Sequence, residues 1–527
     1  MNDIIADGLA GGWQVSRAGD YADNSVIEVD VAIIGTGAGG ATSAEILSAS
    51  GLNVLMIEEG KFRYQKDFKL DELDAFSGMY QEGTGRKTAD GAISIYQGRT
   101  VGGSTTVNWT STFRTPENTL KHWQSEFGLK GFSADDMAPW FANREKALSM
   151  SPWLVPPNGN NSVLKRGCEA LGFSAKTMVR NVKGCWNLGY CGFGCPTNAK
   201  QSMLVTSIPS ALNKKAQLLS NARVERFRIV GDNVEELICT ALDAESNLSL
   251  PKQITVRAKH FVLSAGAIGS PGVLLRSKAP DPYKTLGKRT FLHPVNLCLA
   301  TMKENIKGFE GAPQSVYSNE FLWKDGITGP AGYKLEVAPI FPGGLAAQDA
   351  RYGKRLSTRM KGIVNTSSMI ALMRDGFHEE SQGGVVKLRD DGSPVLDYEI
   401  TDYLWEGFRR AYLSMAEIQF AAGAKSVSVV HHDAEDMQSW AEAKRKIAEL
   451  PLAPLRAALF SAHVMGGCGM GENPKESVVN SLGEHHQLRN LNVIDGSCFP
   501  TSIGANPQLS IYGLAAMQAT QLAKRLV

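Results

Sequence analysis

Two clusters in this 527-residue chain have residue types and spacings that could do chemistry. The first is the segment Gly35-Thr36-Gly37-Ala38-Gly39-Gly40, which matches the pattern G-x-G-x-x-G. Glycines at this spacing allow a tight turn and let a pyrophosphate approach the N-terminus of a helix. An acidic residue about 20 positions downstream binds a ribose hydroxyl in such sites, and Glu58 lies in that place. The segment therefore predicts a dinucleotide site made by Gly35, Gly37, Ala38, Gly40 and Glu58.

The second cluster contains three of the eight cysteines: Cys185, Cys191 and Cys195. Eight cysteines are too few for a disulfide framework in a chain of this length. Three neighbouring thiols are consistent with reduced structural residues, with one disulfide, or with ligands of an iron–sulfur cluster. A structural zinc ion normally needs a fourth ligand. Structural thiols are the favoured interpretation, and the three cysteines stay candidate metal ligands.

Buried strands must position the glycine-rich turn. Residues 28–34, 260–264 and 491–494 are short apolar runs, each followed by a glycine-rich turn. Such runs are typical of strands that are covered on both faces of a parallel sheet. The first run continues into a predicted helix at 38–50 and a predicted strand at 53–57. Because the three runs lie far apart in the sequence, the domain that contains them must be discontinuous.

The rest of the chain predicts a second lobe. Residues 300–440 mix strand-like pieces, such as 384–388, with helical pieces, such as 402–422. This mixture is typical of an α+β lobe inserted into an α/β domain. We therefore assign residues 1–25 to an N-terminal extension, residues 26–115, 200–295 and 455–527 to the dinucleotide-binding domain, and residues 116–199 and 296–454 to the inserted lobe.

Composition excludes several classes of protein. The 55 Lys and Arg residues nearly balance 53 Asp and Glu residues, so the net charge of +2 gives no footprint for nucleic acid. The hydrophobic content of 43% is ordinary for a folded chain. No run reaches the roughly 18 apolar residues of a membrane span, and the polar start does not resemble a signal peptide. We expect a cytoplasmic protein, free or peripheral to a membrane, with no nucleic-acid partner.

Five further segments carry a resemblance to a known family. They resemble the signatures of the glucose–methanol–choline (GMC) oxidoreductases, in the same order along the chain, and this family uses FAD. The segment Cys191-Gly192-Phe193-Gly194-Cys195 is also similar to the long-chain alcohol oxidases and the related FAD-dependent bacterial alcohol dehydrogenases. The five segments are Gly98–Asn108, Ser264–Pro271, His463–Cys468, Asp495–Ser497 and Gly504–Pro507.

The resemblance implies the fold and the cofactor site. It implies a discontinuous, Rossmann-like FAD lobe of α/β class, and an inserted α+β substrate lobe built on an antiparallel sheet. Thr106-Val107-Asn108 replaces the histidine that links FAD covalently in some members, so a non-covalent, dissociable FAD is expected. Beyond the residues of the glycine motif, the FAD contacts would come from Gly102, Gly103, Ser104, Asn108, Val224, Asp495, Gly496 and Pro507.

The resemblance also implies the reaction. His463 would be the base and Asn506 its partner in oxidising a primary alcohol, with a long or bulky apolar tail, to the aldehyde by hydride transfer to flavin N5. The apolar runs 337–341 and 369–373 are candidates for the pocket. Oxygen, a quinone or a cytochrome would reoxidise the flavin, so both oxidase and dehydrogenase stay open. A hydroxynitrile lyase, a photodecarboxylase and a non-catalytic flavin-binding protein are the alternatives.

Other histidines and the cysteines receive weaker interpretations. His293 resembles a family position near the junction of the lobes and is expected to be structural. The pairs His431-His432 and His485-His486 lie among polar residues and are expected on solvent-facing loops. The cysteine spacing is similar to that of bacterial FAD glucose dehydrogenases of the same family, which carry an iron–sulfur cluster.

Overall fold

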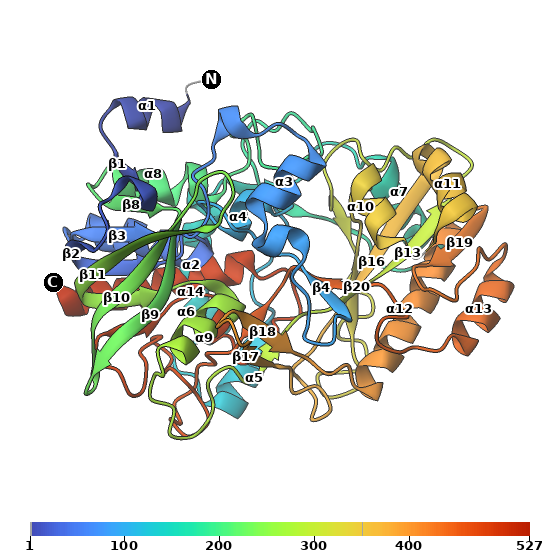
Figure 1. The fold of residues 1–527 in the computed structure, drawn as a ribbon. Helices are drawn as coiled ribbons and strands as arrows, with labels where there is room; N and C mark the ends of the chain where they lie inside the picture. Colours follow the sequence, from blue (N-terminus) through green and yellow to red (C-terminus); the bar gives the residue numbers. More distant parts are fainter. Residues whose placement is uncertain (1–2, 350) are drawn as a thin grey trace.

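The computed structural model describes residues 3–349 and 351–527, and it contains two large sheets. Figure 1 shows the first sheet on the side of the blue and green strands, and the second among the yellow and orange elements. The first sheet has eight strands and the second has six. This architecture confirms the predicted combination of an α/β lobe with an inserted lobe built on a mainly antiparallel sheet.

The first sheet joins strands from distant parts of the sequence, in the order β1-β8-β3-β2-β11-β10-β9. The strand β22 also pairs in parallel with the end of β11, opposite β2. All three apolar runs singled out above are therefore neighbours in one sheet. The bounds are β1 (Gln14–Arg17), β2 (Ser25–Ile34), β3 (Val54–Ile57), β8 (Gln217–Ser220), β9 (Ala222–Val230), β10 (Asn233–Leu242), β11 (Ser249–Leu263) and β22 (Leu491–Val493).

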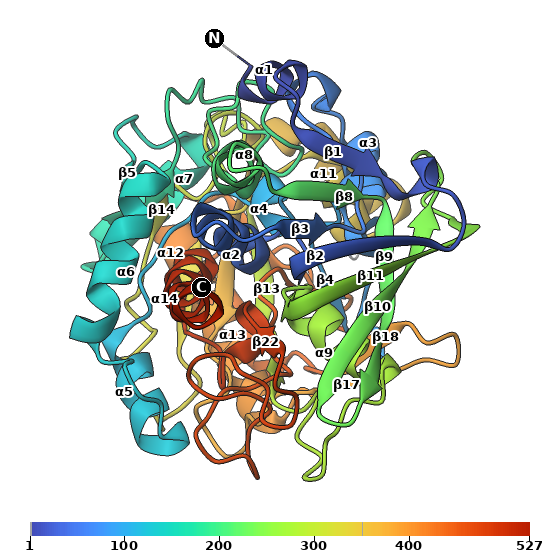
Figure 2. The same cartoon turned by 90° about the vertical axis from the view of Figure 1, so that its left-hand side faces the viewer.

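Helices pack beside this sheet, and one of them begins at the glycine-rich turn. The helix α2 (Ala38–Ala49) follows β2 directly, and it packs against α14 (Gln508–Leu526) and α8 (Ser207–Leu212). Figure 2 shows α14 end-on beside α2. The helix α6 (Ala134–Ala147) also packs on α14, although residues 116–199 were assigned to the inserted lobe. The predicted boundaries between the dinucleotide-binding domain and the inserted lobe therefore stay a prediction.

The second sheet has the order β15-β16-β13-β20-β4, with β19 pairing to β13 as well. All its pairings are antiparallel except the one between β20 and β4. The helix α12 (Asp402–Ala421) packs against β13, β16 and β19, and α7 (Gly159–Leu171) packs against α12. The bounds are β4 (Ile93–Ile95), β13 (Val295–Thr301), β15 (Tyr333–Glu336), β16 (Thr366–Met373), β19 (Ser426–Val429) and β20 (Leu459–Ser461).

Successive residues of β13 and β16 serve different faces, because side chains alternate across a strand. Cys298 and Ala300 of β13 and Ala371 of β16 join the core under α12. Leu297 of β13 and Ile370 of β16 form a separate apolar cluster on the opposite face. That opposite face lines the cavity described below.

Two expectations about exposed features can be checked against the fold. No helix in residues 3–349 and 351–527 combines the length and apolar character that crossing a membrane requires. The expectation of solvent-facing histidine pairs is wrong for His431 and His485, which are 3% and 6% exposed. Nε2 of His431 lies 3.0 Å from the carbonyl oxygen of Pro451, a contact that the polar local sequence does not reveal.

Candidate active site

A cavity of about 970 Å³ lies between the two sheets. Its walls come from the glycine-rich turn, from the segment after β4, from β13 and β16, and from the start of α14. Gly40 and Gly102 do not line it. The predicted site residues that do line it are Gly35, Gly37, Ala38, Glu58, Gly103, Ser104, Asn108, Val224, His463, Asp495, Gly496, Asn506 and Pro507.

The glycines of the turn are required by close backbone approach. Gly35 has φ +95°, and a Cβ there would lie 2.3 Å from the carbonyl oxygen of Ser264. Gly103 has φ +55°, and a Cβ there would lie 2.8 Å from the Cα of Gly37. These two turns therefore meet backbone to backbone at the cavity wall. Gly40 lies behind the wall, where a Cβ would meet the carbonyl of Gly35 at 1.9 Å, so its role is to let α2 pack onto β2.

Glu58 is a buried carboxylate at the end of β3 that lines the cavity. Its Oε2 accepts hydrogen bonds from the backbone N–H and the hydroxyl of Thr36 at 3.1 and 2.6 Å, and its Oε1 accepts one from Gly60 at 2.9 Å. A carboxylate has about four acceptor positions, so one is left for a ligand hydroxyl. Burial raises the pKa of Glu58 to about 7.

This raised pKa predicts that FAD binding depends on pH. Ribose hydroxyls that donate to Glu58 favour its ionised form, so binding releases a proton wherever the free carboxyl is protonated. FAD affinity should therefore rise as the pH rises through about 7. Because the bound carboxylate stays ionised over this range, the dissociation constant should fall about tenfold between pH 6 and pH 8. Titration of the apoprotein with FAD at both pH values measures this, and the Glu58→Gln variant should bind equally at both. A pH-independent dissociation constant in the unmodified protein would contradict the prediction.

The carboxylate of Asp495 is used entirely within the protein. Its Oδ1 accepts from the backbone and hydroxyl of Ser497, and its Oδ2 accepts from Gly266 N at 2.8 Å and Ser270 Oγ at 2.7 Å. Because four donors fill its acceptor positions, the side chain ties the turns after β11 and β22 together. Contacts from this segment to a cofactor are then left to the backbone of Asp495 and Gly496.

The start of α14 forms another part of the wall. Pro507, Gln508 and Ile511 line the cavity there, and the first N–H groups of a helix have no partners within the helix. Asn108 Nδ2 donates to Gln508 Oε1 at 2.8 Å, which links the turn at 102–108 to α14. An anionic or electron-rich group in the cavity would be stabilised at this helix end.

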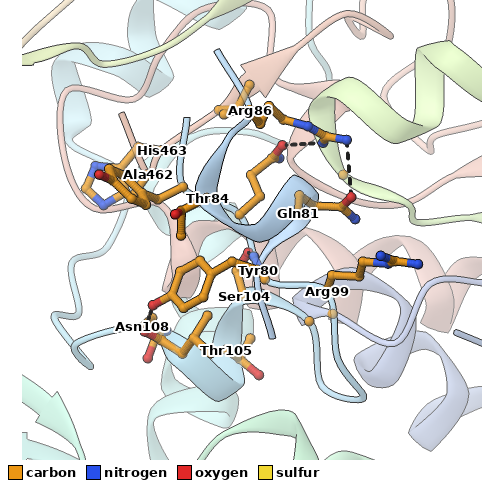
Figure 3. A pocket seen from close by; sticks show the side chains of 18 of the residues that line it. Tyr80, Gln81, Thr84, Arg86, Arg99, Ser104, Thr105, Asn108, Ala462 and His463 are labelled. Atoms are coloured by element: carbon orange, nitrogen blue, oxygen red, sulfur yellow. Dashed lines mark hydrogen bonds between the residues drawn. The ribbon is translucent and has the colours of Figure 1, made fainter. Parts of the chain in front are cut away.

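His463 lies beyond β20 and is partly exposed to the cavity. Figure 3 shows its ring in the pocket with Tyr80, Ser104 and Asn108. Its Nδ1 lies 3.2 Å from Nδ1 of His293. Burial and the nearby charge of Lys334 lower the pKa of His463 to about 3, so the ring is neutral at physiological pH.

His293 was expected to be structural, and the structure places it against His463. It has φ +47°, a left-handed conformation that few non-glycine residues adopt. The buried carboxylate of Asp375 holds this backbone by accepting from Leu292 N at 2.9 Å and from His293 N at 3.1 Å. Such strain tends to be kept where the conformation has a function.

Asn506 is held by two residues that the sequence did not reveal. Its Oδ1 accepts from Lys334 Nζ at 3.0 Å, and its Nδ2 donates to Glu336 Oε2 at 3.1 Å. Lys334 and Glu336 form an ion pair of 2.9 Å in which both side chains are 0% exposed. The sequence offered one signal for this pair. Residues two positions apart on a strand share a face, so Lys334 and Glu336 could be expected to lie side by side.

The loop that contains the cysteine cluster forms part of the wall of the same cavity. Gly192 and Phe193, between Cys191 and Cys195, line the wall, and all three cysteines are free thiols. Lys200 donates to the carbonyls of Cys191, Thr106 and Asn108, so it ties this loop to the turn at 102–108. Over the described ranges, no three His, Cys, Asp or Glu side chains form a group able to hold a metal ion. The iron–sulfur hypothesis for Cys185, Cys191 and Cys195 stays a prediction.

These features fit a bound dinucleotide. The backbones of Gly37 and Gly103 approach each other closely, and a side chain at position 103 would fill the space between them. This space lies beside the N-terminus of α2. Glu58 retains an acceptor position, and the start of α14 lies further along the same cavity. Arg86 also faces the cavity, where it donates to Gln81 and Gln97 at 3.2 and 3.0 Å (Figure 3).

Solved structures share this fold. Pyridoxine 4-oxidase from Mesorbium loti superposes with a TM-score of 0.68 at 17% identity, covering 94% of this chain and 99% of that one. A formate oxidase from Aspergillus oryzae RIB40, studied for its FAD modification, superposes with a TM-score of 0.68 at 16% identity, covering 96% and 100%. At these identities the likeness shows the fold alone.

Sequence relatives extend the comparison to the family. The long-chain-alcohol oxidase FAO1 of Arabidopsis thaliana is 26% identical over 525 residues, which cover 95% of this chain and 67% of that protein. FAO4B of the same plant is 28% identical over 521 residues, covering 95% and 68%. Models described as GMC oxidoreductase match residues 76–295 and 380–515, more than half of the chain. The chain therefore belongs to the GMC oxidoreductase family, as an FAD-dependent oxidoreductase that acts on alcohol donors.

Proposed function

We propose that this protein oxidises primary alcohols with a long or bulky apolar tail to aldehydes, with His463 as the base and Asn506 as the donor to the substrate oxygen. The observation that carries the substrate class is the apolar face of the second sheet, which forms the cavity wall next to His463. The names of the long-chain-alcohol oxidases that resemble this chain support the same class.

The apolar face begins close to His463 and extends away from it. Val295 of β13 pairs with Phe460 of β20, three residues before His463. Val295, Leu297 and Leu299 follow one another on the cavity side of β13, and the run extends about 14 Å at roughly 3.4 Å per residue. Further apolar lining comes from Ile370, Leu372, Ala338, Ile340, Phe341 and Leu345. An alkyl tail on this wall would be removed from water over most of its length.

The second apolar run, at 369–373, divides between cavity and core. Ile370 and Leu372 line the cavity, whereas Met369, Ala371 and Met373 pack under α12. The alternation of a strand explains why only half of the run faces the cavity. The other run, at 337–341, contributes all its residues except Val337 to the cavity wall.

The two polar groups at the end of this wall suit alcohol oxidation. Bound FAD supplies the acceptor for the hydride that leaves the carbinol carbon. Neutral His463 takes the hydroxyl proton at Nε2, which requires its other proton to stay on Nδ1. His293 Nδ1, at 3.2 Å, is the acceptor that holds the proton there. Asn506 Nδ2 donates to the oxygen as negative charge develops on it.

Anaerobic flavin reduction with straight-chain primary alcohols of increasing length tests the proposal. We expect the ratio of the limiting rate constant to the alcohol dissociation constant to rise with chain length, because each added methylene buries more apolar area, worth ~0.8 kcal/mol. Bulky aromatic alcohols serve as a second series. An optimum at short polar alcohols would contradict the substrate class. Cyanide release from a cyanohydrin, without flavin bleaching by any alcohol, would contradict the reaction.

A further inference from the structure

The second sheet places a buried ion pair on the same face as the apolar residues that line the cavity. Lys334 and Glu336 of β15 stand opposite Leu372 and Ile370 of β16, so the four side chains share a face. Both charged side chains are 0% exposed, and Asn506 lies against them. Given the proposed role of Asn506, on which this inference rests, we propose that Lys334 and Glu336 are positioning residues that fix the Asn506 amide for catalysis.

The chemistry of the two partners leaves the amide one orientation. An ammonium group can only donate hydrogen bonds, so the atom of Asn506 that faces Lys334 Nζ at 3.0 Å must be the oxygen. An ionised carboxylate can only accept, so the atom that faces Glu336 at 3.1 Å must be the nitrogen. The amide nitrogen has two hydrogens. One is used by Glu336, and the second is free for the oxygen of a substrate in the cavity.

Surrounding residues hold the pair itself in place. Gln314 Nε2 donates to Glu336 Oε2 at 2.6 Å, and Ser111 Oγ donates to Gln314 Oε1 at 2.6 Å. The ammonium of Lys334 lies 3.2 Å from the ring centre of Phe113, which allows a cation–π contact. Asn506 is therefore the end of a chain of fixed polar groups, and a rotation of its amide would break two charge-assisted hydrogen bonds.

Burial of this pair argues against a purely structural role. Removing two charges from water is costly, and buried ion pairs are often replaced by uncharged residues of similar size with no loss of stability. A sequence under selection for stability alone would place apolar residues here, as it does at Leu372 and Ile370 on the next strand. The pair also acts on the second polar group of the site, because the charge of Lys334 lowers the pKa of His463.

The test is a double-mutant cycle between the pair and Asn506, measured on the FAD-loaded enzyme. The pair is replaced jointly by Lys334→Met with Glu336→Gln, which keeps similar volumes and leaves no single buried charge. We expect the limiting rate constant of flavin reduction to fall about 10- to 100-fold, while the alcohol dissociation constant changes little. In the Asn506→Leu background the same two substitutions should lower the rate much less, because the part of their effect that acts through Asn506 is already lost.

Several results would overturn the inference. Retention of the full rate by the pair variant would do so, and so would an equal fold loss in both backgrounds, which is the additivity expected of a structural pair. Thermal unfolding midpoint and FAD content identify a folding defect, and Lys334→Leu with Glu336→Met provides a second uncharged variant for the cycle if the first joint one does not fold. A normal rate in Asn506→Leu itself would instead contradict the proposed function. The two failures are thereby distinguishable.

Discussion

Replacing His463 by Gln should lower the limiting rate constant of alcohol-dependent flavin reduction about 100- to 10,000-fold, the usual contribution of a general base. The reason is chemical, since the amide of Gln cannot take the hydroxyl proton from the alcohol. FAD should stay bound, because His463 makes none of the contacts of the glycine-rich turns with Glu58 and Asp495. Anaerobic stopped-flow absorbance of the flavin, together with FAD content, measures both quantities.

A matched control for this variant is His432→Gln. His432 is exposed, outside the cavity and followed along the chain by solvent-facing residues, so the same chemical change there should leave the rate unaltered. If His463→Gln were reduced by alcohol as fast as the unmodified protein, His463 could not be the base. A loss of rate that accompanies loss of FAD would instead place His463 in cofactor binding.

Replacing Asn506 by Leu should lower the same rate constant about 100- to 1,000-fold, which is the cost of removing one donor to a developing oxyanion. The leucine side chain has a similar volume and removes the N–H that would face the substrate oxygen. Because this hydrogen bond strengthens as charge develops, the loss should fall mainly on the limiting rate constant and little on alcohol binding. Single-turnover reduction over a range of alcohol concentrations separates the two parameters.

The matched control for the second variant is Asn319→Leu, since Asn319 is exposed and lies outside the cavity. We expect it to keep both the rate and the FAD content. A change confined to the alcohol dissociation constant in Asn506→Leu would indicate that Asn506 binds substrate and transition state equally. That result would remove it from charge stabilisation.

The fold could be predicted where a local sequence pattern determines the structure. The ends of the apolar runs before Gly35, Ala265 and Asp495 are buried, and their composition indicated covered strands of a parallel sheet. The structure adds that the three strands are neighbours. The glycine motif was equally readable, because close backbone approach excludes every other residue at Gly35. The family resemblance then supplied FAD and the alcohol donor class, and the comparisons confirm both.

The rest depended on contacts between residues far apart in the sequence. Lys334 and Glu336 look like ordinary solvent-facing residues, because lysine and glutamate are almost never fully buried unless paired. In the structure both are buried and bind Asn506, which lies 170 and more positions away. His293 was expected to be structural because it resembles a family position near the junction of the lobes, and its contact with His463, 170 positions away, could not be read from the sequence.

The alternation of β13 has a consequence for how this enzyme could change. Residues 295, 297 and 299 line the cavity, whereas 298 and 300 belong to the core under α12. A library confined to the odd-numbered positions would therefore alter the cavity wall, where each of these side chains is itself buried, and one at positions 298 and 300 would alter the packing under α12. Directed evolution of the cavity can therefore target alternate positions of this strand and leave its other face unchanged.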